Sequence, residues 1–335
     1  MPQVIRAMFN PSAYNSGTDV TASELSNFSV PAAMSIQSVS SKNVLRTFST
    51  RGNGFNMFNG ITIGWQAFSG NEFYVHFTAL TVDNNAYIMI NNTTMNGSNN
   101  DPQLRFQILG STWTLFSTSV TVNITYPASL TVKFTRSGNT ITRIDVYRDG
   151  STIPVASQTG SVAAGANLHI SAPITGTSIG AVSYAYYRDL VIYTGDYAGI
   201  LECRSIPVFA ELSADSVVAA GTNRVLNLNQ KTTGNSANIN RQVRAGKDLF
   251  TFDTSALQST DEVLAINSKI RLRSLNRTDT FQYLRKAADD SWNNNFSGTR
   301  DTNVATHYSL LNQLNGQPIT KELLDSMVVG YQAAP

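Results

Sequence analysis

Short segments of alternating apolar and polar residues, separated by turn residues, run from Val44 to about Tyr197. Two of them place apolar side chains at every second position: Ile61, Ile63 and Trp65, and Phe73, Val75 and Phe77. A period of two indicates a strand with one buried face. Many short strands without helical periodicity indicate an all-β sandwich or barrel. The turn sequence Ser69-Gly70-Asn71 predicts that these two strands pair as a hairpin.

The stretch from Leu130 to Ser157 makes the most specific prediction. Two turn sequences divide it, Ser137-Gly138-Asn139 and Asp149-Gly150. Apolar positions recur in the three segments that the turns separate: Leu130, Val132 and Phe134, then Ile141, Ile144, Val146 and Tyr147, then Ile153 and Val155. The pattern predicts a meander of three antiparallel strands.

The pattern changes beyond Ile206, which predicts a second domain. A polar, Asn-rich run over residues 222–242 has one apolar cluster around Val225 and Leu228, and we interpret it as a strand followed by a long loop. Two later segments predict further strands. One is centred on Leu249–Phe252, and in the other Ile270 and Leu272 alternate with charged residues.

Near the C-terminus the spacing of apolar residues becomes helical. Two groups show it: Leu310, Leu311 and Leu314 before Gly316, and Leu323, Leu324, Met327 and Val328 before Gly330. Thr320 suits the N-cap of the second helix and Gly330 its C-terminal end. We therefore predict short C-terminal helices whose apolar stripe packs on the chain's own core, with partner binding as the alternative.

Three stretches resemble a known family. The hairpin Thr135–Thr140, the Tyr-x-Asp-Gly turn within Val146–Gly150 and the segment Val155–Ser157 resemble the core of concanavalin-like jelly rolls of the laminin-G type. Tyr187–Tyr193 stands where that family has its closing D-x-x-I-Y strand. The resemblance covers roughly residues 20–200. It implies an antiparallel jelly-roll sandwich over residues 1–203, including an extended N-terminal segment.

These patterns together predict an all-β protein of two domains. The jelly-roll sandwich is followed, over residues 204–335, by a second, smaller, mainly-β domain with short C-terminal helices, for which we expect a role in docking or oligomerisation.

The amino-acid composition argues against several classes of function. Only 14% of residues are charged, and 24 Lys and Arg are scattered among 22 Asp and Glu, for a net charge of +2. Neutralising nucleic-acid phosphates requires a dense basic face, so we expect no nucleic-acid binding. No window approaches 18 apolar residues and the opening segment lacks the order of a signal peptide, so we expect neither a membrane span nor a secretion signal. Cys203 alone excludes an internal disulfide and a cysteine-based zinc site.

Catalytic motifs are equally scarce. Glycoside hydrolysis usually needs two placed carboxylates, yet Glu24 and Glu72 are the only glutamates in the first 200 residues and no strand clusters acids. The histidines lie far apart and have no second ligand at metal spacing: His76, His169 and His307. Gly52-Asn53-Gly54 lacks the flanking strand and helix of a phosphate loop. We predict no catalytic residue, no resident metal and no cofactor.

Two kinds of binding site remain to be weighed. Asp83-Asn84-Asn85 and Asn99-Asn100-Asp101 offer oxygen atoms to calcium, although we favour their interpretation as turn caps. Sugar binding would use exposed aromatic rings, for which the candidates are Trp113, Tyr184 and Tyr186. Tyr184 and Tyr186 alternate with Ala185, so one sheet face should carry both. We favour core packing for these rings over sugar binding.

The function hypothesis follows from this combination. A low-charge, Asn-, Ser- and Thr-rich sandwich is typical of extracellular or particle surfaces, and a virion component, assembled in the host cytoplasm, needs no secretion signal. This resembles the tail, fibre and capsid-decoration proteins of bacteriophages, by fold-level analogy. We predict a non-enzymatic structural component that contacts other virion proteins and copies of itself. A host-receptor or glycan-binding adhesin is the alternative, and a glycoside hydrolase is disfavoured.

Overall fold

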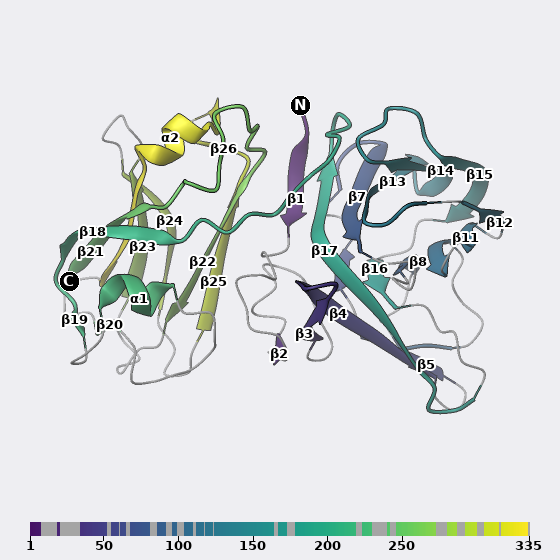
Figure 1. Cartoon of the computed structure of the whole chain (residues 1–335), viewed down its shortest axis with the longest axis horizontal. Helices are drawn as coiled ribbons and strands as arrows, with labels where there is room; N and C mark the ends of the chain where they lie inside the picture. The colour runs from purple at the N-terminus through teal and green to yellow at the C-terminus, as the bar shows by residue number, and fades with distance from the viewer. Residues whose placement is uncertain are drawn as a thin grey trace. The chain divides into compact units, whose positions relative to one another are not determined.

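The computed structural model divides the chain into two compact units, Met1–Cys203 and Arg204–Pro335. They are coloured purple to teal and green to yellow in Figure 1. The structure describes residues 1–7, 19–20, 34–51, 55–59, 61–64, 68–80, 86–91, 96–98, 104–109, 112–116, 118–122, 124–163, 167–172, 178–218, 223–229, 240–241, 246–272, 280–286, 292–299, 305–314 and 316–333.

The first unit is an antiparallel sandwich of two sheets. The larger sheet has eleven strands: β1 (Gln3–Ala7), β2 (Asp19–Val20), β3 (Met34–Val39), β4 (Lys42–Arg51), β5 (Phe55–Asn59), β7 (Glu72–Ala79), β9 (Asn96–Ser98), β13 (Ala128–Ser137), β14 (Thr140–Arg148), β15 (Ala156–Ala163) and β17 (Val182–Thr194). The smaller sheet has six: β6 (Ile61–Gly64), β8 (Ala86–Asn91), β10 (Leu104–Leu109), β11 (Thr112–Leu115), β12 (Thr118–Thr121) and β16 (Asn167–Ser171). The fold is therefore all-β, as predicted.

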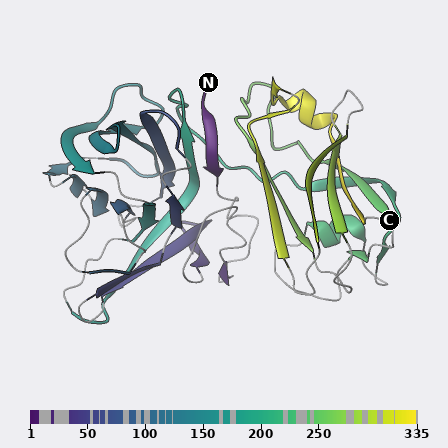
Figure 2. The ribbon, with the colours of Figure 1, turned by 180° about the vertical axis from the view of Figure 1, so that it is seen from behind.

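Strand order explains how distant segments meet. The main path of the larger sheet runs β15-β14-β13-β7-β17-β4-β3-β2, and the smaller sheet runs β12-β11-β10-β8-β16-β6. The chain passes back and forth between the sheets. As a result β17 pairs with β7 and β4, two strands that come much earlier in the sequence (Figures 1 and 2). This crossing pattern is that of a jelly roll.

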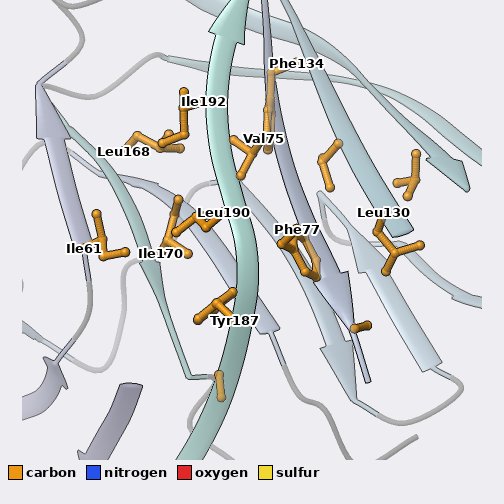
Figure 3. Packing of buried hydrophobic residues seen from close by; sticks show 14 of the residues in the cluster. Ile61, Val75, Phe77, Leu130, Phe134, Leu168, Ile170, Tyr187, Leu190 and Ile192 are labelled. Carbon is orange, nitrogen blue, oxygen red and sulfur yellow. The ribbon is translucent and has the colours of Figure 1, made fainter. Parts of the chain in front are cut away.

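The core lies between the two sheets. Figure 3 shows Val75 and Phe77 of β7 with Leu130 and Phe134 of β13 on one side. From the smaller sheet come Ile61, Leu168 and Ile170, and β17 adds Tyr187, Leu190 and Ile192. All ten are almost fully buried. Period-two alternation within each strand produces this arrangement, because it turns one set of side chains inward from each sheet.

The predicted meander is confirmed in its strand order, but its third strand begins at Ala156, so Ile153 and Val155 precede it and are exposed. β13 pairs with β14 and β14 with β15, each antiparallel. Asp149 and Gly150 both have positive φ, of 50° and 76°, and the amide of Ser151 donates to the carbonyl of Arg148 at 2.9 Å. Asp-Gly is favoured where two consecutive residues of a turn have positive φ, and this turn opens the connection from β14 to β15. The Tyr187–Tyr193 segment lies within β17, which pairs with β7 and β4.

The predicted pairing of the Ile61 and Phe73 segments is wrong. β6 pairs with β16 in the smaller sheet, whereas β7 lies in the larger one. The rings of Phe68 and Phe73 lie 4.6 Å apart. Both segments bury their apolar face in the same core but from opposite sheets, a distinction that alternation along the chain does not contain.

The second unit contains a five-stranded antiparallel sheet with the order β18 (Val208–Ala214), β21 (Lys247–Phe252), β28 (Val328–Ala333), β23 (Thr280–Lys286) and β24 (Trp292–Thr299). Three two-stranded pairs accompany it: β19 (Val217–Val218) with β20 (Asn240–Arg241), β22 (Ile266–Leu272) with β25 (Ala305–Leu311), and β26 (Gln313–Leu314) with β27 (Gln317–Pro318). Its two described helices are α1 (Arg224–Leu228) and α2 (Lys321–Asp325). None of the described helices is long and apolar enough to cross a membrane. The core includes Phe250, Leu324, Val329 and Tyr331.

Several sequence predictions for this unit are confirmed. The strands expected at Leu249–Phe252 and around Ile270 are β21 and β22. Thr320 is the N-cap of α2, and its hydroxyl accepts from the amide of Leu323 at 3.2 Å. A short C-terminal helix therefore exists where it was expected.

Three predictions for this unit are wrong. The cluster around Val225 lies in helix α1 instead of a strand. Leu310, Leu311 and Leu314, expected in a helix, lie in strands β25 and β26, and His307 also lies in β25. Short apolar runs do not distinguish the two structures, and pairing with β22 decides in favour of strand here.

The third error concerns the end of α2, which ends at Asp325 and not at Gly330. Gly330 lies in the middle of β28, and a Cβ atom added there would lie 2.0 Å from the carbonyl oxygen of Asp248. Close approach of two backbones, and not a helix end, therefore explains this glycine.

Candidate functional site

The outer face of the larger sheet carries two tyrosines on β17, of which Tyr184 is exposed and Tyr186 is half-buried. Alternation along this strand buries Ala185 and Tyr187 in the core and turns Tyr184 and Tyr186 the other way. Tyr184 is 40% exposed, and Val182 beside it is 45% exposed. The prediction that one face carries both tyrosines is confirmed, whereas the interpretation that they pack in the core is wrong. The smaller sheet covers only the opposite face.

Neighbouring strands add side chains to this face. In the antiparallel register Tyr184 lies opposite Phe48 and Tyr186 opposite Arg46, and Arg46 in turn lies opposite Ser35 of β3. Directly opposed residues on adjacent strands share a face. We call these five residues the Tyr184 surface.

Arg46 is held in a defined position on this surface. Its Cζ lies 4.8 Å from the centre of the Tyr184 ring, in a cation–π contact. Its Nε donates to the Ser35 hydroxyl at 3.1 Å, and the Gln37 side-chain amide donates to the same hydroxyl at 3.4 Å. The Tyr184 surface thus combines aromatic rings with ordered polar groups.

Such a combination suits a ligand that is both flat and hydroxylated. An aromatic ring packs against the C–H face of a sugar, while guanidinium and amide groups bind its oxygens. Sequence reasoning identified Tyr184 and Tyr186 but missed Arg46, Phe48 and Ser35. The stretch Leu45–Thr50 does alternate, but only the strand pairing reveals which half faces outward.

Trp113, the third aromatic candidate, is not exposed. It lies on β11, opposite Ile108 and Val120 in the neighbouring strands, and is fully buried in the core of the sandwich. Core packing, which we favoured over sugar binding for this ring, is confirmed, because β11 turns this side of the strand toward the larger sheet.

The other half of the outer face is covered by the segment from Gly195 to Cys203, the 195–203 segment. His76 alternates with Val75 and Phe77 on β7, so it points to the opposite face from them, and it is fully buried beneath this segment. His76 Nδ1 lies 2.8 Å from the Thr131 hydroxyl, and Nε2 lies 3.0 Å from the Leu201 carbonyl oxygen. Burial lowers the pKa of His76 to about 4. The residue is therefore a neutral structural group at neutral pH.

Further contacts hold the 195–203 segment on the sheet. The Asp189 carboxylate accepts from the amide of Cys203 and the hydroxyl of Thr78, each at 2.9 Å. Burial raises the pKa of Asp189. The ring of Tyr197 lies 4.7 Å from that of Tyr147. This half of the face is therefore closed by the chain itself.

The acidic residues at the edge of this covered region are engaged with neighbours. Glu72 pairs with Lys133 at 2.6 Å. Asp145 accepts from Arg143 Nε at 2.8 Å and from the Ser157 hydroxyl at 2.6 Å. These bonds give both carboxylates a structural role.

The remaining sequence candidates contribute little to a site. His169 is fully buried on β16. Across the described residues, no group of three or more His, Cys, Asp and Glu side chains is placed to hold a metal ion. Four candidates lie outside the described residues: Glu24, Gly52-Asn53-Gly54, Asp83-Asn84-Asn85 and Asn99-Asn100-Asp101.

Comparisons with known proteins add only weak likenesses. No protein-family model and no curated protein matches the chain. The chain is similar to the GH131 β-glucanase catalytic domain from Podospora anserina, with a TM-score of 0.29 and 9% identity over 50% of this chain and 81% of that one. The HCR/D F1240A mutant has a TM-score of 0.29 and 11% identity, covering 96% and 84%. The botulinum neurotoxin type G receptor binding domain has a TM-score of 0.22 and 12% identity, covering 90% and 97%. TM-scores this low carry no argument about function.

Proposed function

We propose that the sandwich is a non-enzymatic glycan-binding module, and that the chain presents it on a virus particle as a tail, fibre or capsid-decoration protein. The observation that carries the proposal is the outward-facing Tyr184 ring, held beside Arg46 on a rigid sheet. Binding groups placed on paired strands keep their geometry before the ligand arrives, which lowers the entropic cost of binding.

Binding is favoured over catalysis by the state of the acidic residues. A glycosidase needs one carboxylic acid and one carboxylate facing the same sugar. On the described outer face, Glu72 is neutralised by Lys133, and Asp145 is buried and bound by Arg143 and Ser157. The Tyr184 surface contains no acid.

Attachment to a particle is proposed for the second unit. This unit has its own core, which includes Phe250, Leu324 and Tyr331. A separate core lets one unit contact ligand while the other contacts copies of itself or other virion proteins. The low charge of the chain, with 14% charged residues, is compatible with close subunit contact.

The proposal is tested by glycan-array and host-cell binding of the purified full chain, compared with Tyr184→Ala. We expect the wild type to bind and the variant to lose most of this binding. The matched control is Ile153→Ala, which removes another exposed side chain, 75% exposed, from the same unit and should bind as the wild type does. Absence of any glycan or cell binding by the wild type would show that the sandwich is not a glycan-binding module.

Placement in a virion is tested separately. Antibodies against the chain should label intact particles in electron micrographs, and deletion of its gene should destabilise particles or remove a projection. Unlabelled particles whose protein complement lacks the chain would contradict this half of the proposal.

A further inference from the structure

Arg46 differs from three other arginines of the sandwich in its charge environment. Arg143, Arg148 and Arg188 each lie within 4 Å of a carboxylate, at 2.8, 3.1 and 3.4 Å. Among the described residues Arg46 forms no ion pair, and the only hydrogen bond of its guanidinium runs from Nε to Ser35. Its two terminal nitrogens therefore remain available to a ligand.

The geometry around Arg46 keeps this charge ready for binding. The Tyr184 ring supports the guanidinium from one side, and the buried Ser35 hydroxyl holds its Nε. Fixing a long side chain in advance reduces the entropy lost when it binds an anion. A guanidinium also presents parallel N–H groups that match the two oxygens of a carboxylate.

We infer that the Tyr184 surface binds a sugar that bears a carboxylate, of the sialic acid or uronic acid class, with the sugar ring against the exposed Tyr184 ring and the carboxylate on Arg46. This inference rests on the proposed glycan binding and names its ligand class. A carboxylate is favoured over a phosphate or sulfate ester because Arg46 is the one cation on the surface, and its planar fork fits a planar two-oxygen anion.

The test measures binding of the full chain to four defined probes: sialyllactose, an unsulfated glucuronic-acid disaccharide, lactose and 3-sulfated lactose. We expect at least one carboxylated probe to bind roughly 10- to 100-fold more tightly than lactose, since hydrogen bonds to charged groups have that effect. Arg46→Gln should abolish this preference. Arg46→Lys, which keeps the charge but not the fork, should retain part of it. Tyr184→Ala should weaken binding of all the probes.

The matched control is Arg148→Gln, because Arg148 is paired with Asp149 and three strands lie between β14 and β4 in the sheet. It should bind as the wild type does. Equal binding of lactose and both carboxylated probes, unaffected by Arg46→Gln, would overturn the inference and leave glycan binding intact. Tighter binding of the sulfated probe than of both carboxylated ones would overturn the assignment to a carboxylate. Absence of binding to every glycan would overturn the proposed function itself, and the inference with it.

Discussion

His76 and Leu201 lie 125 positions apart in the chain, and Nε2 of His76 lies 3.0 Å from the Leu201 carbonyl oxygen and 3.3 Å from the Leu201 amide nitrogen. With the proton on Nε2, the ring donates to the Leu201 carbonyl oxygen, and Nδ1 accepts from the Thr131 hydroxyl at 2.8 Å. A neutral imidazole has one donor and one acceptor, and this tautomer satisfies both. The bond thereby joins the 195–203 segment to the centre of the larger sheet.

Stability of the sandwich should fall on acidification below pH 6.5. The pKa of His76 is about 4 in the folded protein and 6.5 as the ordinary value, so the unfolded chain binds more protons between these limits. The free energy of unfolding therefore increases as pH rises across this window and decreases as pH falls. Between pH 6.5 and pH 5 the loss should be about 2 kcal/mol. Urea unfolding of the full chain at several pH values measures it.

The variant His76→Gln isolates this contribution, because glutamine keeps a hydrogen-bonding amide but does not titrate. It should flatten the pH dependence between pH 5 and 6.5 relative to the wild type. The comparison cancels the effect of Asp189, whose raised pKa acts with the opposite sign. An unchanged slope in His76→Gln would show that another group is responsible.

Substitution of Asp189 should loosen the 195–203 segment. Its carboxylate is almost fully buried and accepts from Cys203 and Thr78, so Asp189→Ala leaves a buried amide and a hydroxyl without their acceptor. We expect a loss of about 2–3 kcal/mol. Asp189→Asn should cost less, because asparagine keeps one acceptor and tolerates the positive φ of 54°. Faster hydrogen exchange at the Cys203 amide in Asp189→Ala would confirm the assignment, and unchanged protection would contradict it.

Gly330 should not tolerate even alanine. The added methyl group would lie 2.0 Å from the Asp248 carbonyl oxygen and 2.8 Å from a Leu249 side-chain carbon, so β28 and β21 would have to separate. We expect Gly330→Ala to destabilise the second unit by at least about 3 kcal/mol. Val328→Ala, on the same strand but half-buried, is the control and should cost less. Thermal unfolding, followed with a separate probe in each unit, shows whether a variant destabilises the second unit alone and by how much.

Trp113 and Tyr184 should behave in opposite ways. Trp113→Ala leaves a cavity in the core and should cost about 3–5 kcal/mol of stability. Tyr184→Ala should cost less than about 1 kcal/mol, because it removes an exposed ring and one cation–π contact. Unfolding curves and glycan binding, measured on both variants, separate the roles. Strong destabilisation by Tyr184→Ala would place its ring in the core after all.

Local patterns predicted the features that depend on neighbours in sequence. Asp149 and Gly150 predicted a turn because these residue types favour the positive φ that both adopt. Thr320 predicted an N-cap because its hydroxyl can accept from the Leu323 amide three residues later. The alternation in β7 and β17 identified which residues share a face. These features could be predicted because each depends on a few adjacent dihedral angles and side chains.

The amino-acid sequence by itself determined that the chain is all-β, that it contains the meander, and that Tyr184 and Tyr186 lie on the same face of one strand. Only the tertiary structure decided which face of β17 is solvent-exposed, that β6 and β7 belong to different sheets, and that Arg46 lies against Tyr184. It also decided that the 195–203 segment closes the half of the outer face above His76. Alternation specifies two faces but not what covers each, because the covering strand comes from a distant part of the chain through long-range pairing.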